Sequence, residues 1–527
     1  MFRGGGARTL AQARIASALE AILMTDKQSY IVVTRFLLGL LVAGSGLLAL
    51  PTADGRSQAQ TAPAPKTENA KVLPRAVTGS LAQTVSEWAA RADHPEWLAY
   101  SVPAVSGERQ VCCGENWENG SCGPCRLEGN EHGNNISLRG ENVELEGPHR
   151  MIVLLRADAR KIGKIRIVSE ACSIDAGGLE ITWLADINAA ESVKFLKGFV
   201  DGKELDERGG ERLSRGAVSA IALHGDPSAD QALRTFTTPD NPEGLRKEAA
   251  FWAGQARGAA GVKLLKQMAK DDPSSDVRAQ VTFALSVSRE GDAVDEMIRM
   301  AHDDSSSHVR GQALFWLGQK GGRKAVQTIT GAIENDPDTE VKNKAVFALS
   351  QLPKDEGVPM LIEVVQKNPH PDVRSQALFW LAQKAGGKAV QTIAGAIEND
   401  PDTEVKKKAV FALSQLPKDE GVPMLIEVAQ KNPHPDVRSQ ALFWLAQKAG
   451  GKAAGTITGA IENDPDTEVK KKAVFALSQL PKDEGVPKLI EVAQTNRNPE
   501  VRKQAMFWLG QSNDPRALDF FEKVLSK

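Results

Sequence analysis

Five cysteines are the residues of this chain whose type and spacing could do chemistry: Cys112, Cys113, Cys122, Cys125 and Cys172. Cys122-Gly-Pro-Cys125 has the spacing of a redox-active dithiol, whose attacking thiol needs a pKa lowered by a helix N-terminus. The same pair together with Cys112 and Cys113 could hold zinc, because Cys-x-x-Cys supplies half of a common tetrahedral site. In an oxidising compartment, however, the default fate of such cysteines is structural disulfides.

The residues around the cysteines favour disulfides. Cys122-Gly-Pro-Cys125 also resembles the thioredoxin motif, but Gly- and Asn-rich residues precede it where a thioredoxin has a strand, and no βαβ pattern surrounds it. Adjacent cysteines such as Cys112 and Cys113 rarely complete a structural zinc site. We therefore predict no catalytic residue, no metal and no cofactor, and five disulfide candidates with Cys172 as a partner for one of the other four. Zinc at Cys112, Cys113, Cys122 and Cys125, and thiol–disulfide exchange, remain alternatives.

Residues 1–59 are predicted to be a signal peptide or an N-terminal membrane anchor. Phe36–Leu50 is an apolar run of signal-peptide length, short for a membrane span, with basic residues before it. Ser57-Gln58-Ala59 is a candidate cleavage site that would leave Gln60 at the new N-terminus, and Met24 is an alternative start to Met1. Either outcome predicts an exported protein that is periplasmic, envelope-anchored or secreted, with membrane contact only through this segment if it is uncleaved.

Two segments of different composition follow. Residues 60–74, with Ala-Pro-Ala-Pro, predict a flexible linker, and residues 75–205 a small β-rich domain that contains all the cysteines. In that domain Met151–Leu155 predicts a buried strand. Ile165–Val168 and Leu179–Trp183 flank Gly177-Gly178 and predict a hairpin.

Residues 206–527 repeat a 32-residue unit ten times, which predicts a solenoid whose units bury their apolar faces against their neighbours. A Val-Arg or Val-Lys pair, or a looser version of it, marks each unit, at residues 213, 245, 277, 309, 341, 373, 405, 437, 469 and 501. A phenylalanine follows six residues after each of the last nine: Phe251, Phe283, Phe315, Phe347, Phe379, Phe411, Phe443, Phe475 and Phe507.

Each unit predicts two helices, so we expect a mainly α fold, a right-handed α-solenoid of about ten two-helix repeats. After each phenylalanine, Trp and Ala alternate, which predicts large-against-small packing in the core and a two-unit packing repeat. Residues 341–404 and 405–468 differ at only five positions, as a recent duplication would. The runs Lys406–Lys408 and Lys470–Lys472 are interpreted as a solvated helix face, with Glu404 pairing Lys408.

The repeated Asp-Pro-Asp-x-x-Val-Arg unit resembles the HEAT repeat, in the short bacterial form also found in phycobilin lyases, as in Asp272-Pro273 with Val277-Arg278. In that family the Asp and Arg of successive units form a ladder that fixes the stacking. The resemblance implies a ladder here, which Asn368, Asn432 and the lysines 342, 406 and 470 interrupt, because Lys lacks the bidentate fork of Arg. The implied structural residues are Asp272, Arg278, Asp304, Arg310, Asp336, Arg374, Arg438 and Arg502, together with Asp400 and Asp464.

The function predicted from these patterns is a non-enzymatic protein–protein interaction scaffold of the cell envelope. The formal net charge of -2 does not favour nucleic acid or an anionic membrane surface. The sequence contains no phosphate loop, zincin helix or nucleophile elbow. HEAT arrays mostly bind proteins, so the resemblance implies an unidentified protein partner along one solenoid face. The alternative function is that of an oxidoreductase or zinc-binding module at Cys112–Cys125.

Overall fold

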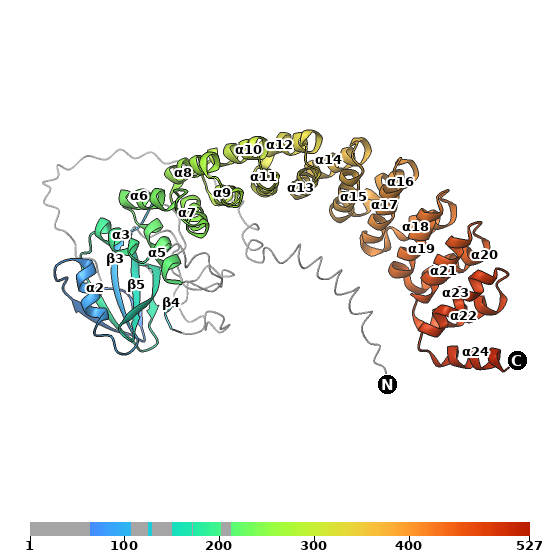
Figure 1. Ribbon diagram of the computed structural model, residues 1–527, viewed down its shortest axis with the longest axis horizontal. Coiled ribbons are helices and arrows are strands. Elements are labelled where there is room, and N and C mark those ends of the chain that lie inside the picture. Colours follow the sequence, from blue (N-terminus) through green and yellow to red (C-terminus); the bar gives the residue numbers. More distant parts are fainter. Residues whose placement is uncertain (1–63, 107–124, 129–149, 171, 202–211, 527) are drawn as a thin grey trace, which may run out of the picture. The chain divides into compact units, whose positions relative to one another are not determined.

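The structure is a computed structural model that describes residues 64–106, 125–128, 150–170, 172–201 and 212–526. Within them, a small β-containing region is followed by an array of paired helices (Figure 1). The predicted mainly α repeat solenoid behind a small β-rich region is thus confirmed. The predicted boundary at residue 205, the signal or anchor segment and Cys112, Cys113 and Cys122 lie outside the described residues.

The β-containing region holds two sheets. A three-stranded parallel sheet has the order β1-β7-β4, and a five-stranded mixed sheet has the order β2-β8-β3-β5-β6. The strands are β1 (Thr67–Glu68), β2 (Lys71–Arg75), β3 (Glu96–Pro103), β4 (Cys125–Arg126), β5 (Arg150–Asp158), β6 (Lys161–Ser169), β7 (Ile174–Asp175) and β8 (Glu180–Leu184).

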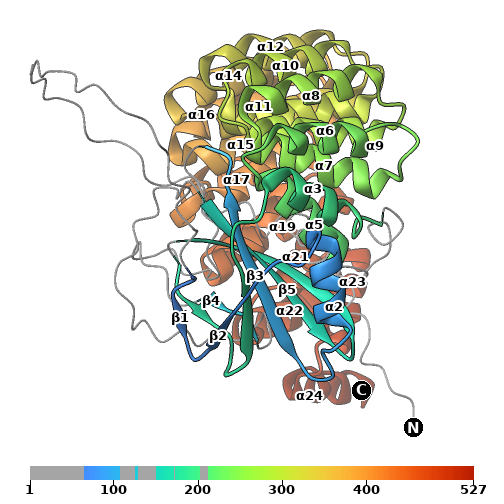
Figure 2. The same cartoon turned by 90° about the vertical axis from the view of Figure 1, so that its left-hand side faces the viewer.

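The five-stranded sheet is buried on both faces. Successive residues of a strand point to opposite faces, so Trp97 and Ala99 of β3 join one core while Leu98 and Tyr100 join the other. The first core lies against the small sheet and includes Cys125 and Cys172. The second lies under α2 (Leu81–Ala89), α3 (Ala189–Lys197) and α5 (Arg212–Leu223), on the other side of the sheet (Figure 2).

The predicted hairpin between Ile165–Val168 and Leu179–Trp183 is wrong. β6 pairs antiparallel with β5, and β8 lies between β2 and β3, parallel to both. The true hairpin turns at Ala159 and Arg160, whose φ angles of 48° and 64° are left-handed. Two-residue turns with left-handed φ angles usually contain Asn or Gly, and because this turn contains neither, the sequence does not predict it. The Arg160 N–H donates to the carbonyl of Ala92 at 2.7 Å and helps to hold the turn.

Ten helix pairs make up the described array, and Figure 1 shows first and second helices in two rows. The first helices are α5, α7 (Glu243–Ala256), α9 (Ser275–Val287), α11 (Ser307–Lys320), α13 (Thr339–Gln351), α15 (Pro371–Ala385), α17 (Thr403–Gln415), α19 (Pro435–Ala449), α21 (Thr467–Ser478) and α23 (Pro499–Gln511). The second helices are α6 (Pro227–Phe236), α8 (Gly258–Asp271), α10 (Asp292–Asp303), α12 (Gly322–Asn335), α14 (Lys354–Lys367), α16 (Val390–Asn399), α18 (Val422–Lys431), α20 (Ala454–Asn463), α22 (Lys482–Thr495) and α24 (Pro515–Leu525). Short 3-10 turns η1 (Gly386–Ala389), η2 (Pro417–Asp419) and η3 (Gly450–Ala453) precede α16, α18 and α20.

Buried ion pairs connect successive helix pairs. Arg374 of α15 donates from Nε and Nη2 to both carboxylate oxygens of Asp400, at 2.7 and 2.8 Å, and from Nη1 to the carbonyl of Asn368 at 2.9 Å. Each such rung joins an arginine to the aspartate 26 residues later, in the next unit. The five rungs are Arg246–Asp272, Arg278–Asp304, Arg310–Asp336, Arg374–Asp400 and Arg438–Asp464.

The interruptions of the ladder are matched substitutions. Lys342, Lys406 and Lys470 each stand where an arginine would, and the residue 26 positions later is then Asn368, Asn432 or Asn496. Arginine therefore always faces aspartate, and lysine always faces asparagine. Lys342 instead donates to the carbonyls of Ile333 and Glu334, at 3.1 and 2.7 Å, at the negative end of the helix dipole of α12. Asn368 still accepts the His370 N–H at 2.9 Å, as Asp336 accepts that of Asp338.

This arrangement corrects the interpretation of the lysine runs. Lys406 is only 5% exposed and donates to the carbonyls of Ile397 and Glu398, so it belongs to the buried ladder rather than to a solvated face. Glu404 pairs with Lys407 at 2.6 Å instead of with Lys408. The last ladder arginine, Arg502, donates to the carbonyls of Asn496 and Arg497, at 2.8 and 3.1 Å.

We predict that the two rung types are interchangeable only as pairs. Asp400→Asn leaves the buried Arg374 guanidinium without its counter-charge and should lower the free energy of unfolding by about 3 kcal/mol. The double variant Arg374→Lys/Asp400→Asn recreates a native lysine–asparagine rung and should recover at least half of that loss. Urea unfolding followed by circular dichroism, with hydrogen exchange of α15 and α17, measures both.

The matched control for this experiment is Asp402→Asn. Asp402 is the N-cap of α17, where asparagine is an equally good cap, so the same charge change two residues away should have little effect. Equal stability of Asp400→Asn and Asp402→Asn would show that the rung does not stabilise the stack.

Candidate interaction surface

Each first helix exposes one stripe of four positions. On α19 the stripe is Asp436, Gln440, Phe443 and Gln447, spaced i, i+4, i+7 and i+11, which keeps residues on one helix face. Asp436 and Gln447 are exposed, whereas Gln440 and Phe443 are partly buried. We name the set of these stripes, from α7 to α23, the first-helix face.

An unbroken row of aromatic rings runs along this face. Phe251 and Phe283 stack with ring centroids 5.8 Å apart, and Phe283 contacts Trp316 of the next helix at 4.9 Å. The same alternation of stacked phenylalanines and an intervening tryptophan continues to Trp508. Eight of these phenylalanines are partly buried, and the last, Phe507, is 54% exposed. The row therefore offers aromatic surface in every unit.

The tryptophans, predicted to be core residues, are partly buried. Trp316, Trp380, Trp444 and Trp508 each pack between two phenylalanines. Trp380 contacts Phe347 of the preceding unit and Phe379 of its own helix. The indole N–H groups of Trp380, Trp444 and Trp508 are buried with no acceptor among the described residues. Trp252 differs, because its Nε1 donates to Glu248 at 2.9 Å.

Polar rows flank the aromatic row on both sides. Toward the C-terminal end of the first helices is a row of glutamines, and Gln319 Nε2 donates across units to Gln351 Oε1 at 3.3 Å. The row comprises Gln255, Gln319, Gln351, Gln383, Gln415, Gln447, Gln479 and Gln511. Toward the N-terminal end is an acidic row: Asp276, Glu340, Asp372, Glu404, Asp436, Glu468 and Glu500.

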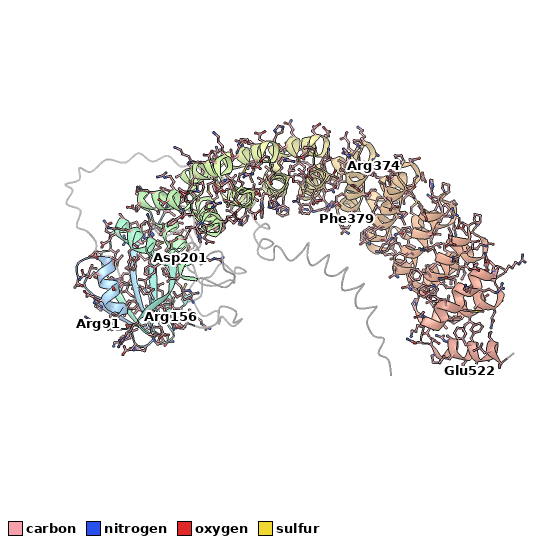
Figure 3. All side chains as sticks on the ribbon, viewed as in Figure 1. Arg91, Arg156, Asp201, Arg374, Phe379 and Glu522 are labelled. Carbon is pink, nitrogen blue, oxygen red and sulfur yellow. The ribbon has the colours of Figure 1, made fainter. Side chains whose placement is uncertain are left out.

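Figure 3 shows how one helix serves both the stack and the surface. Phe379 of α15 lies on the side away from the second helices, whereas Arg374 extends toward α16 and its rung partner Asp400. The ladder residues are thus buried between units, and the first-helix face consists of other positions of the same helices. The sequence predicted the ladder residues and the recurrent phenylalanines but not this face, whose additional signal is a glutamine that recurs at 32-residue intervals in most units.

A groove lies on the second-helix side, between α14 and α16. Its volume is about 500 Å³, and its lining includes Val365, Gln391, Thr392 and Arg374. Of the five positions that distinguish residues 341–404 from 405–468, four lie at or beside this groove: Val365/Ala429, Val390/Ala454, Gln391/Gly455 and Ala394/Thr458. The first-helix face is therefore nearly identical in the two copies, while the second-helix side differs.

Two of the five cysteines belong to the described residues, and both are fully buried in the core between the two sheets. Cys172 is disulfide-bonded. Cys125 lies on β4, a strand that is hydrogen-bonded to β7. Glu128, three residues later, accepts from Arg156 and from Trp97, both at 2.8 Å, which ties this segment to the large sheet. No group of three or more potential metal ligands occurs among the described residues, which lack Cys112, Cys113 and Cys122. Which cysteines pair with one another, zinc binding and thiol exchange thus stay predictions.

A buried polar trio joins the sheet to the array. Tyr100 Oη lies 2.8 Å from Ser192 Oγ, which lies 2.9 Å from His224 Nε2, and His224 Nδ1 lies 2.7 Å from the carbonyl of Ala220. A carbonyl only accepts, so Nδ1 carries the proton, Nε2 accepts from Ser192, and Ser192 accepts from Tyr100. This serine–histidine pair was not predicted from the sequence, in which the two residues are 32 positions apart. All three side chains are inaccessible to a substrate, so the trio is structural.

Backbone contacts reinforce the junction. The N–H of Val105 donates to the carbonyl of Leu223, and that of Gly225 to the carbonyl of Pro103, both at 2.8 Å. Gly216 of α5 lies so close to β6 that an added Cβ would meet the carbonyl oxygen of Ile165 at 2.6 Å. The sheet and the first helix pair are therefore packed as one body.

The family profile for HEAT repeats matches residues 294–377, 358–446 and 456–527. A comparison with curated proteins finds no match. Among solved structures, human deoxyhypusine hydroxylase in complex with glycerol is similar at 17% identity, over 56% of this chain and 96% of that one, with a TM-score of 0.22. The complex of CpcE and CpcF of phycocyanin lyase from Nostoc sp. PCC7120 matches at 21% identity, over 47% of this chain and 94% of that one, with a TM-score of 0.23. Kap121p bound to Nup53p matches at 15% identity, over 62% of this chain and 41% of that one, with a TM-score of 0.38.

The part of the chain that the structure describes includes no helix of sufficient length and apolar character to span a bilayer.

We predict that acid loosens the junction through His224. Burial lowers the pKa of His224 to about 4; the hydrogen bond to the Ala220 carbonyl and the charge of Asp226 oppose this shift, and the charge of Arg257 adds to it. Because the unfolded pKa is about 6.5, the stabilisation is complete above pH 6.5 and is lost as the pH falls toward 4, by about 3 kcal/mol in all. Hydrogen exchange of β3 and α5, corrected for intrinsic rates, should show protection falling across this window in the native protein.

The variant His224→Gln keeps a polar side chain but cannot titrate, so most of this pH dependence should disappear from β3 and α5. An unchanged pH profile in His224→Gln would assign the effect to other groups.

Proposed function

We propose that this HEAT-repeat solenoid is a non-enzymatic scaffold of the cell envelope that binds a protein partner along its first-helix face. The observation that carries the proposal is the unit-by-unit recurrence of aromatic, amide and acidic side chains on that face, from α7 to α23. Burial of the ladder explains stacking, but it does not require a phenylalanine and a glutamine at exposed or partly exposed positions of nearly every unit. Repeated surfaces of this kind suit a ligand that extends over several units.

The sheet at the N-terminal end supports this role by covering the first helix pair. Solenoids need ends that hide the apolar face of the terminal unit, and here α5 packs against β6 and the polar trio. The proposed disulfides would strengthen that cap in an oxidising compartment.

We predict that a photo-crosslinking residue placed at Gln383 or Gln447 will capture a protein in the native cell. Matched positions are Gln366 of α14 and Gln430 of α18, which are also exposed glutamines 64 residues apart but lie on second helices. Adducts of defined mass are expected from the first pair and not from the second. The same adducts from both pairs, or none from either, would contradict a partner on the first-helix face.

Export and disulfide formation predict a specific intact mass. Protein purified from its native host should begin near Gln60, with four cysteines resistant to alkylation until reductant is added. A full-length mass with five alkylated cysteines would place the protein in a reducing compartment and contradict its proposed location in the cell envelope.

A further inference from the structure

We infer that the last described helix pair, α23–α24, is a second docking site, which receives a helix pair of a different polypeptide whose first helix brings an aspartate to Arg502. This site is separate from the first-helix face and goes beyond the proposed function. We name it the end face. It comprises Arg502, Met506 and Gly510 of α23 with the exposed Leu518 and Leu525 of α24.

Arg502 has the posture of a ladder arginine but lacks the carboxylate. Its Nη1 donates to the carbonyl of Asn496 at 2.8 Å. Arg374 makes the same contact with the carbonyl of Asn368, at 2.9 Å, while its Nε and Nη2 bind both oxygens of Asp400. Arg502 forms no ion pair with any described residue. A guanidinium held in this way presents two donors in the geometry that suits a carboxylate.

Met506 occupies a position that is otherwise reserved for stacking. It lies one turn beyond Arg502 on the same side of α23. The equivalent residue is fully buried in every earlier first helix of the described array, whereas Met506 is partly exposed. These equivalents are Val218, Ala250, Thr282, Leu314, Val346, Leu378, Val410, Leu442 and Val474.

Gly510, one turn further along α23, keeps a place for close helix approach. An added Cβ on its equivalent Gly318 would lie 2.8 Å from Cα of Ala348 in the next first helix. An added Cβ on Gly254, another equivalent, would clash with the next first helix in the same way. At Gly510 an added Cβ would meet no atom within 4 Å. The stacking surface of α23 is therefore built like an internal one and is uncovered among the described residues.

The outer side of α24 is apolar as well. Of the four large hydrophobic side chains that are exposed among the described residues, three lie on α24: Leu518, Val524 and Leu525. Ala517 and Phe520 already bury the inner side of this helix. A solenoid unit that faces water usually carries polar residues there, so apolar residues at this place indicate a covered surface.

Charge excludes a second copy of this chain as the occupant. Two end faces docked together would bring Arg502 against Arg502 with no aspartate at the ladder position. The opposite end of the array is covered, because α5 packs on β6 and Gly216 leaves no room at Ile165. The occupant is therefore a helix pair of another protein with an aspartate at the start of its first helix. Residues 464–495 of this chain have that form, since Asp464 completes the rung of Arg438 at 2.7 and 2.8 Å.

The test is isothermal titration of the purified protein with a synthetic peptide of residues 464–495, with circular dichroism to follow helix gained on binding. The same peptide with Asp464→Asn should bind at least tenfold more weakly. The protein variant Arg502→Lys should lose this preference for aspartate, because lysine faces asparagine in the native ladder.

A glycine pair locates the site. Gly510→Leu should weaken binding at least tenfold, because the side chain occupies the space that a docked helix needs. The matched control is Gly455→Leu on α20, where an added Cβ also meets no atom within 4 Å, and it should bind as the unaltered protein does. Both changes replace an open helical glycine, so the fold should persist, and thermal unfolding checks this.

A second measurement does not depend on the affinity of a free peptide. The same 464–495 segment, joined after Lys527 through a flexible linker, should raise the hydrogen-exchange protection of α23 at least tenfold. The joined segment with Asp464→Asn should raise it far less.

Several outcomes would overturn the inference: equal binding of the aspartate and asparagine peptides, equal effects of the two glycine variants, or no gain in protection from the joined segment. Self-association of the purified protein that Gly510→Leu abolishes would also overturn it, because the end face would then serve a second copy. None of these outcomes bears on the first-helix face, whose crosslinks at Gln383 and Gln447 test the proposed scaffold independently.

Discussion

The buried arginine–aspartate rung is the interaction on which the array depends. A guanidinium held by two carboxylate oxygens at 2.7–2.8 Å, as in Arg374–Asp400, fixes both the distance and the rotation between two helix pairs. The cost of burying either charge alone explains why the pairs change together, arginine with aspartate and lysine with asparagine. Since the rung sets the stacking of the units, the exposed stripe of each first helix repeats along the array.

Much of this arrangement can be read from the sequence, and the reason is its period. A signal that recurs every 32 residues averages out local ambiguity, so the two helices of each unit and the ladder residues are predictable. The β-containing region has no repeat to average over. Its β5–β6 turn rests on left-handed Ala159 and Arg160, which tertiary contacts hold in place, and local residue preferences pointed to Gly177-Gly178 instead. Lys406 shows the same limit, because only its neighbours in space make it a buried residue.

The trio Tyr100–Ser192–His224 has the spacing of a catalytic pair but not the access that catalysis requires. A serine and a histidine at 2.9 Å have the distance of a nucleophile and its base, but complete burial removes substrate, water and a place for a developing oxyanion. What remains is a hydrogen-bonded connection between β3, α3 and the end of α5. Each donor in it has one acceptor, so the three elements can meet in only one way, and the sheet and the array share a single orientation at their junction.

The near identity of residues 341–404 and 405–468 has a consequence for how this chain reaches its native state. Either copy can present the same interlayer surfaces and the same rung partners to the unit before or after it. A chain that looped out one copy would therefore stack the remaining units almost as well, and such register-shifted stacks are the natural kinetic traps of repeat proteins. The differences around the groove, from Val365/Ala429 to Ala394/Thr458, are nearly all that lets the folding chain distinguish one copy from the other.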